Sequence, residues 1–168
     1  MAEMVQNIDY QPPHYHVFLY PDAPRNNGQY FYREDLNGRF YIEVQEGVNR
    51  DTESDYVHVH FTLPFDAPLV HGDLFVSGAL NNWEFNDINR MQYNFEKKAY
   101  ELDLLVKQGY YNYEYAYIME DSRFPDATYI EGSYYETEND YLIYVYLSTN
   151  TSRYDRLIAY QILNSIRK

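Results

Sequence analysis

One-by-one alternation of apolar and polar side chains is the feature that most limits how this chain can fold. In the segment 56–62, valine and phenylalanine alternate with tyrosine, histidine and threonine, and the segment 100–106 repeats this period. Successive side chains of a β-strand point to opposite faces, so a period of two predicts strands with one buried face. No segment sustains the 3.6-residue period of a helix. Only residues 156–166 leave a short helix open as an alternative to a strand.

Further strand signals recur along the chain with turn residues between them. Asn37-Gly38 predicts a tight hairpin, and the polar stretch 48–54 marks a boundary. We expect residues 1–54 to form an extended and hairpin segment packed on a sandwich made by residues 55–168. Eight or nine short strands predict an all-β sandwich. The expected strands are 15–20, 30–32, 40–44, 56–62, 74–77, 100–106, 110–118, 141–147 and 157–163.

Tyrosine is the most unusual part of the composition, with 22 Tyr beside 9 Phe and a single Trp. It suits half-buried sheet positions, because the ring packs while the hydroxyl reaches water or a partner. Tyr111, Tyr113, Tyr115 and Tyr117 share one face of a predicted strand. Such a stripe is either an interaction surface or part of the core between sheets. We favour the core, since stripes at strand spacing are usually buried.

Charge and hydropathy exclude several classes of partner. The formal net charge is −13, and so acidic a surface repels phosphate backbones, which leads us to expect no nucleic-acid partner. No apolar run reaches 18 residues, so no transmembrane helix is expected. The first ten residues lack the basic and apolar regions of a signal peptide. The chain has no cysteine, which excludes disulfides and thiolate chemistry.

Two His-x-His pairs, His14/His16 and His58/His60, are the best candidates for metal ligands. Residues two apart on a strand share a face, so each pair could hold one ion. Further ligands would have to come from elsewhere in the chain. We interpret the pairs as polar strand faces and predict neither a metal site nor another cofactor, with His58 and His60 as weak candidates.

The remaining candidate chemistry is sparse. Asp51, Glu53 and Asp55 loosely resemble the start of a calcium loop, but Tyr56 stands where such a loop needs glycine. Ser77 lacks the Gly-x-Ser-x-Gly context of a nucleophile elbow, and no glycine-rich loop could cradle a phosphate. The sequence therefore predicts a binding protein and no enzyme.

The segment 72–83, Gly-Asp-Leu-Phe-Val-Ser-Gly-Ala-Leu-Asn-Asn-Trp, resembles the opening strand and turn of glycogen-binding modules. Such modules occur on the beta subunit of AMP-activated kinase and on starch-branching enzymes. Their turn reads Gly-x-Phe-Asn-x-Trp, and here Leu80 stands in place of the phenylalanine. The similarity covers about residues 55–147 and implies an early-set immunoglobulin-like sandwich.

In that family the turn tryptophan stacks on a glucose ring, which implies a sugar contact for Trp83 beside Asn82. The resemblance also places Phe124 at the family's second tryptophan and Asn139 at an asparagine near the last strand. Glu114 stands where the family has a lysine. An acid in place of the lysine and a smaller ring in place of tryptophan weaken a sugar platform. A packing role for Trp83 at the edge of the sandwich explains the residue equally well.

A second resemblance spans nearly the whole chain and is carried by the motifs Pro24-Arg25-Asn26-Asn27-Gly28, Tyr32–Phe40, Asp55–Phe61, Lys107–Tyr113 and Tyr154–Leu157. Together these motifs resemble the C-terminal part of the type IX secretion system plug proteins. It implies an exported protein at the periplasmic side of an outer-membrane translocon, whose pore it closes when no substrate passes. The signal peptide of such a protein would lie outside this chain.

The leading hypothesis is therefore a non-catalytic domain that associates with, or plugs, this translocon in the periplasm by protein–protein contact. The alternative is a carbohydrate-binding module that stacks a glucan on Trp83, with Phe124 or Tyr129 as the second ring. A metal site built on histidine is the third hypothesis.

Overall fold

The computed structural model describes residues 4–26, 36, 38–42, 54–134, 136–137, 139–150 and 153–165. Strands dominate these ranges, which confirms the all-β prediction, and none of their helices is long and apolar enough to cross a membrane. The helical elements are the 3-10 turn η2 (Ala79–Asn81) and α2 (Thr128–Glu131). The strands are β1 (Val5–Gln11), β2 (His14–Leu19), β3 (Phe40–Ile42), β4 (Tyr56–Pro64), β5 (Gly72–Gly78), β6 (Gln92–Asn94), β7 (Ala99–Lys107), β8 (Gly109–Tyr111), β9 (Tyr113–Met119), β10 (Asp140–Leu147) and β11 (Arg156–Asn164).

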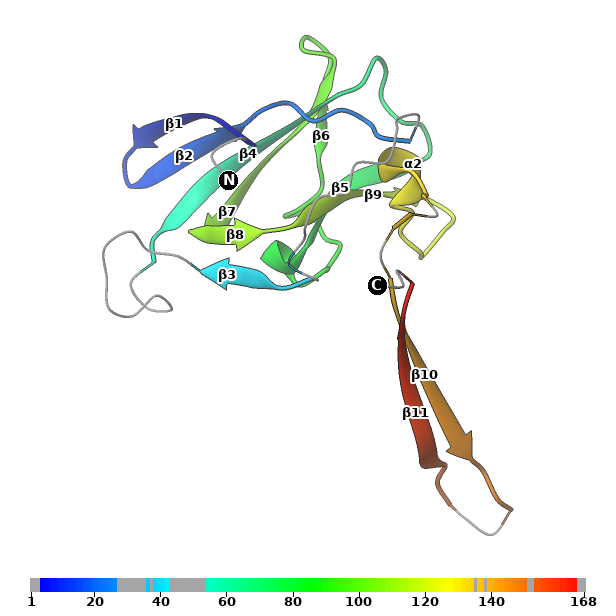
Figure 1. The fold of residues 1–168 in the computed structure, drawn as a ribbon. Coiled ribbons are helices and arrows are strands. Elements are labelled where there is room, and N and C mark those ends of the chain that lie inside the picture. The colour runs from blue at the N-terminus through cyan, green and yellow to red at the C-terminus, as the bar shows by residue number, and fades with distance from the viewer. Residues whose placement is uncertain are drawn as a thin grey trace. The chain divides into compact units, whose positions relative to one another are not determined.

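Five strands form the largest sheet, in the order β1-β2-β4-β7-β6 (Figure 1). All neighbours in this sheet are antiparallel except β2 and β4, which run parallel with His16 opposite His58. Two further antiparallel pairs, β5 with β9 and β3 with β8, complete this part of the chain.

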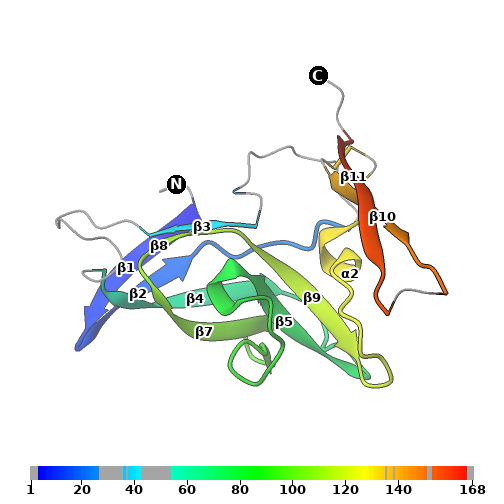
Figure 2. The same cartoon turned by 90° about the horizontal axis from the view of Figure 1, so that it is seen from below.

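The core lies between the five-stranded sheet and the β5–β9 pair (Figure 2). Alternate residues of β4 and β7 point into it, as their sequence period requires. Two layers of sheet around one apolar core are a β-sandwich, so that prediction is also confirmed. Its immunoglobulin-like character stays a prediction. The buried cluster is Phe61, Leu63, Leu74, Val76, Met91, Tyr100, Leu104, Val106, Tyr115, Tyr117 and Ile130.

The structure divides the chain at a different place from the predicted boundary. The polar stretch 48–53 lies outside the described residues, as do residues 30–32, expected to be a strand, and Asn37 of the expected hairpin turn. Strands β1 and β2 hydrogen-bond into the same sheet as β4, so they are part of the sandwich and not a segment packed on it. Contacts place most residues up to Gly132 in one unit and Ser133–Lys168 in a second.

Two strands, β1 and β6, were not predicted from the sequence. Both lie at edges of the five-stranded sheet, and β1 reads Val-Gln-Asn-Ile-Asp-Tyr-Gln with almost every side chain exposed. An edge strand that buries no face needs no alternation of apolar and polar residues, so the strand period could not reveal β1. Near the other end of the chain, residues 156–166 could have formed a helix or a strand according to the sequence, and the structure shows strand β11 there.

Candidate functional site

The tyrosine stripe of β9 belongs to the core, as expected. Tyr115 and Tyr117 are buried, Tyr113 is half-buried, and Tyr111 lies on the neighbouring strand β8. Their hydroxyls find partners at the margin of the core: Tyr117 donates to the carbonyl of Val70 at 2.7 Å. The stripe is thus a packing feature and does not form the functional surface.

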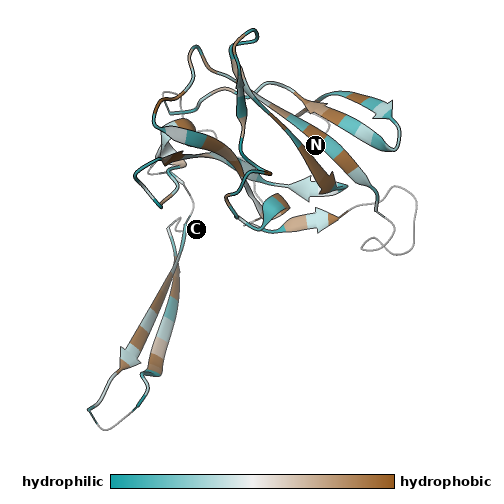
Figure 3. Ribbon diagram, turned by 180° about the vertical axis from the view of Figure 1, so that it is seen from behind, coloured by the Kyte–Doolittle hydropathy of each residue, from teal (hydrophilic) through white to brown (hydrophobic). Residues whose placement is uncertain are grey.

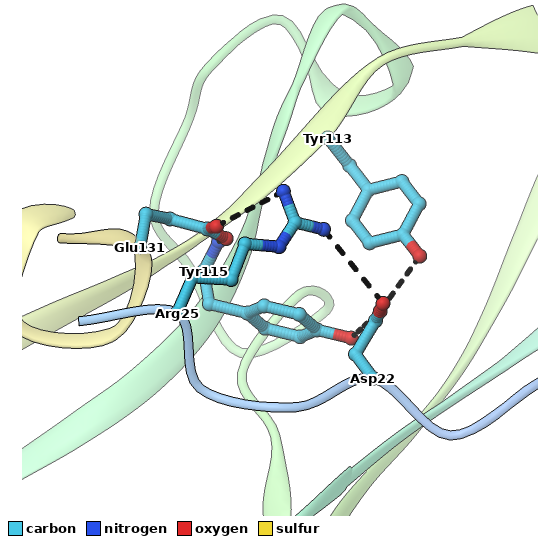
Figure 4. Close-up of polar contacts among 5 residues, drawn as sticks. All are labelled: Asp22, Arg25, Tyr113, Tyr115 and Glu131. Atoms are coloured by element: carbon cyan, nitrogen blue, oxygen red, sulfur yellow. Dashed lines mark hydrogen bonds and ion pairs between the residues drawn. The ribbon is translucent and has the colours of Figure 1, made fainter. Parts of the chain in front are cut away.

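An aspartate in the segment after β2 lies at the centre of a polar network (Figure 4). Oδ2 of Asp22 accepts hydrogen bonds from the hydroxyls of Tyr113, at 2.8 Å, and Tyr115, at 2.7 Å. Arg25 approaches Asp22 at 3.9 Å and Glu131 at 3.4 Å. Glu131 in turn accepts the backbone N–H of Tyr115 at 2.9 Å. The network ties the segment after β2 to β9 and α2.

Burial raises the pKa of the Tyr113 and Tyr115 hydroxyls, and the charge of Asp22 raises both further. Burial also raises the pKa of Glu131, against the opposing effects of the Tyr115 N–H and of Arg25. Tyrosines that hold their protons so firmly act as donors and not as bases. We therefore interpret the network as a structural clamp.

A rigid loop after β5 presents the single tryptophan. The backbone N–H of Trp83 donates to the carbonyl of Gly78 at 3.0 Å. The side-chain amides of Asn81 and Asn89 each donate to the carbonyls of Val76 and Glu84. Trp83 is 49% exposed, and a Cβ at Gly38 would lie 3.3 Å from Cζ2 of its indole, so the ring packs against Gly38 while about half of the residue remains accessible to a ligand.

The structure does not assemble the predicted sugar residues into one platform. Trp83 and its exposed neighbour Asn82 lie at the Gly78 end of β5, whereas Phe124 follows the Met119 end of β9. Because Gly72 pairs with Met119 and Gly78 with Tyr113, these are opposite ends of the β5–β9 pair. A seven-residue strand spans roughly 20 Å, too far for two rings to share one sugar unit.

Asn139 belongs to the second unit, where its backbone N–H donates to Oγ of Ser165 at 2.8 Å at the base of the β10–β11 hairpin. Phe124 is 82% exposed and lies in the loop before α2. Among the described residues, the resemblance to the glycogen-binding turn therefore located one exposed aromatic residue, Trp83, and its predicted partner ring Phe124 does not lie beside it.

The histidine pairs lie on neighbouring strands, and the structure brings them together. His58 and His60 are on β4, and His14 and His16 on β2, which runs beside it. All four rings point away from the core, on the outer face of the five-stranded sheet. Of the calcium-like residues, Asp51 and Glu53 lie outside the described residues.

The β10–β11 hairpin carries a surface that sequence analysis did not single out. Its cross-strand pairs include Leu142 with Ile162 and Tyr144 with Tyr160. Figure 3 shows apolar residues on both strands of the hairpin. Residues opposite one another on paired strands share a face, so beyond the polar Asp140–Asn164 pair three successive cross-strand pairs place only apolar or aromatic side chains on one side of the ribbon. We call this side the hairpin's apolar face. Its residues are Leu142, Tyr144, Tyr146, Leu157, Tyr160 and Ile162.

All six side chains of the hairpin's apolar face are exposed. A two-stranded ribbon has no second layer of its own to cover such a face, and an isolated hairpin is marginally stable in water. Contiguous exposed apolar patches on proteins commonly mark interaction sites. The opposite side of the ribbon is more mixed, since it includes Gln161 and Arg156. A period of two alone could not reveal this face, because apolar residues occupy both sides of β10.

Comparison with known proteins adds a structural relative. The chain is similar to the crystal structure of a hypothetical protein from Parabacteroides merdae ATCC 43184, with 43% sequence identity and a TM-score of 0.85. The similarity covers 96% of this chain and 40% of that protein, so the chain spans less than half of its relative's length. No protein-family model matches the sequence, and no curated protein matches it.

Proposed function

We propose that this chain is a non-catalytic β-domain of an exported protein that associates with, or plugs, the outer-membrane translocon of the type IX secretion system. It acts by protein–protein contact at the periplasmic side of the membrane. The observation that carries the proposal is the hairpin's apolar face, whose six aromatic and aliphatic side chains are all exposed.

The chemistry of this face suits a protein partner. Tyr144, Tyr146 and Tyr160 offer large rings together with hydroxyl groups, and tyrosine is enriched at protein interfaces for this reason. Leucine and isoleucine fill the space between the rings. The choice of a translocon as partner rests on the resemblance of the motifs in 24–28, 55–61 and 107–113 to the plug proteins.

The decisive experiment is a pull-down of solubilised outer membranes of the source bacterium with the tagged chain. We expect the translocon protein to be recovered by the unaltered chain. The double variant Leu142→Ser/Tyr144→Ser removes two side chains of the hairpin's apolar face and is expected to lower the recovery about tenfold or more.

The opposite side of the same strand supplies a matched control. Ile143→Ser/Val145→Ser removes two exposed apolar side chains of β10 that point away from the hairpin's apolar face. This variant should recover the translocon as the unaltered chain does. Equal losses in both variants would refute the hairpin's apolar face as the contact, and no recovery by the unaltered chain would refute the translocon as the partner.

A second candidate function, glucan binding, is favoured by the exposure of Trp83. An indole held on a rigid loop can stack on the flat face of a sugar ring. Since Trp83 is the single tryptophan, its fluorescence reports directly on that loop. A saturable change on titration with soluble glucan, lost in Trp83→Ala, would support this function, and an unchanged spectrum would refute it.

A further inference from the structure

Four of the chain's five histidines gather on the outer face of the five-stranded sheet. The parallel register of β2 with β4 sets His16 opposite His58. The antiparallel register of β4 with β7 sets His60 opposite Asp103. Because alternate residues of one strand share a face, His14 and His16 project on the same side as these groups. Three neighbouring strands thus supply imidazoles and a carboxylate to one surface.

Distances within this group are short. Nδ1 of His16 lies 2.8 Å from Nε2 of His60, and one potential ligand atom each from His16, His60 and Asp103 lies within 4.8 Å of the others. Tetrahedral zinc with bonds of about 2.0–2.1 Å keeps its ligand atoms roughly 3.3 Å apart. To bind zinc, the two histidine nitrogens would have to move slightly apart, and the Asp103 carboxylate would have to move closer to both of them. The Asp103 side chain is 45% exposed, so it has room to rotate.

His58 forms a hydrogen bond with the carboxylate of Asp103. Its Nδ1 lies 2.7 Å from Oδ1 of Asp103, and its ring stacks on that of His16 with centroids 4.6 Å apart. A carboxylate has a second oxygen, so Asp103 can bond His58 and still offer a ligand atom. Hydrogen-bonded partners of this kind orient the ligands of metal sites and tune their affinity.

We propose that His16, His60 and Asp103 bind one divalent transition-metal ion of the zinc class, with His58 as a positioning residue. Two imidazoles and a carboxylate form a ligand set that suits such ions, and three protein ligands leave a position for water. The net charge of −13 favours cations near the surface. The ion would cross-link β2 to β4 and β7 and so stabilise this side of the five-stranded sheet.

A stack of neutral imidazoles without an ion is the competing arrangement, in which one of the His16 and His60 nitrogens donates to the other. The two arrangements differ in a measurable way, because only the metal site is stabilised by added ion.

The test is a zinc titration of the chain by calorimetry and thermal melting, after removal of any polyhistidine tag. We expect one ion per chain and a melting temperature that rises with zinc concentration. His16→Ala and His60→Ala should each weaken zinc binding about 100-fold, and His58→Ala about tenfold. Cobalt titrated in place of zinc should give the visible absorption of a four-coordinate site, lost in the same variants.

Two histidines serve as controls. His14→Ala removes a ring from the same sheet face outside the proposed ligand set, and His71→Asn removes the fifth histidine at a φ of 65° that asparagine tolerates. Both should bind zinc as the unaltered chain does. Asp103→Asn keeps the shape of an exposed side chain and tests a ligand even if a histidine variant fails to fold. Absence of saturable binding, or binding unchanged in His60→Ala and Asp103→Asn, would overturn the site.

Discussion

The hydroxyl of Tyr115 lies 2.7 Å from Oδ2 of Asp22, although the two residues are 93 positions apart. Tyr115 is almost fully buried, and its hydroxyl would otherwise be a buried donor without an acceptor. Asp22 meets that need for Tyr115 and for Tyr113 at once. The contact connects the segment after β2 to the core strand β9.

Asp22→Ala should therefore be strongly destabilising. It leaves two tyrosine hydroxyls without their acceptor and removes a neighbour of Arg25, so we expect the free energy of unfolding to fall by about 2–4 kcal/mol. Urea unfolding followed by circular dichroism measures the loss. Asp66→Ala, which removes an exposed aspartate, should change it by less than about 0.5 kcal/mol. Equal effects in the two variants would contradict the clamp.

The raised pKa of Glu131 predicts a pH dependence of stability. Burial is its main cause, so the folded chain binds this proton more tightly than the unfolded chain, whose glutamates have pKa values of about 4.3. The stabilising contribution is complete below that value and is lost as the pH rises through the folded pKa. Glu131→Gln should remove this decrease in stability above about pH 4.3, seen as a difference between the pH profiles of the two proteins.

Glu101 should give a pH dependence of stability with the opposite sign to that of Glu131. Burial alone would raise its pKa, but hydrogen bonds from Lys97 and Asn94 outweigh burial and lower it. Its stabilising contribution is present at neutral pH and lost as the pH falls through the folded pKa. A Glu131→Gln difference profile with the same sign as that of Glu101→Gln would contradict the assignment.

Truncation of a buried side chain in the core between the two layers should lower the free energy of unfolding. Leu74 on β5 is fully buried in the cluster between the two layers, so Leu74→Ala should cost about 2–5 kcal/mol. Ile88→Ala truncates an aliphatic side chain that is mostly exposed and should cost less than about 0.5 kcal/mol. Both values come from denaturant unfolding. A small loss at Leu74 would mean that the layers are less tightly packed than the structure shows.

Strands that bury one face were predictable because burial of one face requires alternating apolar and polar residues, which are visible in the local sequence. The alternation in 56–62 and 100–106 follows from the core positions of Phe61 and Leu104, and β4 and β7 appear where expected. Strand β1 was not predicted because an exposed edge strand does not need this alternation. The division of the chain after Gly132 depends on which strands pair, and the strand period cannot show pairing.

Candidate sites were less predictable because they depend on pairing at long range. Each His-x-His pair is visible locally, yet the approach of His16 to His60 needs β2 to lie parallel to a strand more than 40 residues away. The same limit applies to the sugar residues, where a local motif located Trp83 but could not show that Phe124 lies at the far end of the strand pair. Pairing across the hairpin likewise decides which residues form its apolar face.

Gly78→Ala should both destabilise the sandwich and disturb the tryptophan loop. A Cβ at this position would lie 2.4 Å from the backbone oxygen of Asn112, so the backbone of the segment entering β9 would have to shift. Overpacking of this kind costs about 1–3 kcal/mol. Because the carbonyl of Gly78 accepts the N–H of Trp83, the shift should also change the tryptophan emission spectrum of the folded chain. A lower midpoint of urea unfolding together with a shifted spectrum would confirm that the pairing of β5 with β9 holds the tryptophan loop in place. An unchanged midpoint would show that the two backbones are further apart than the structure has them.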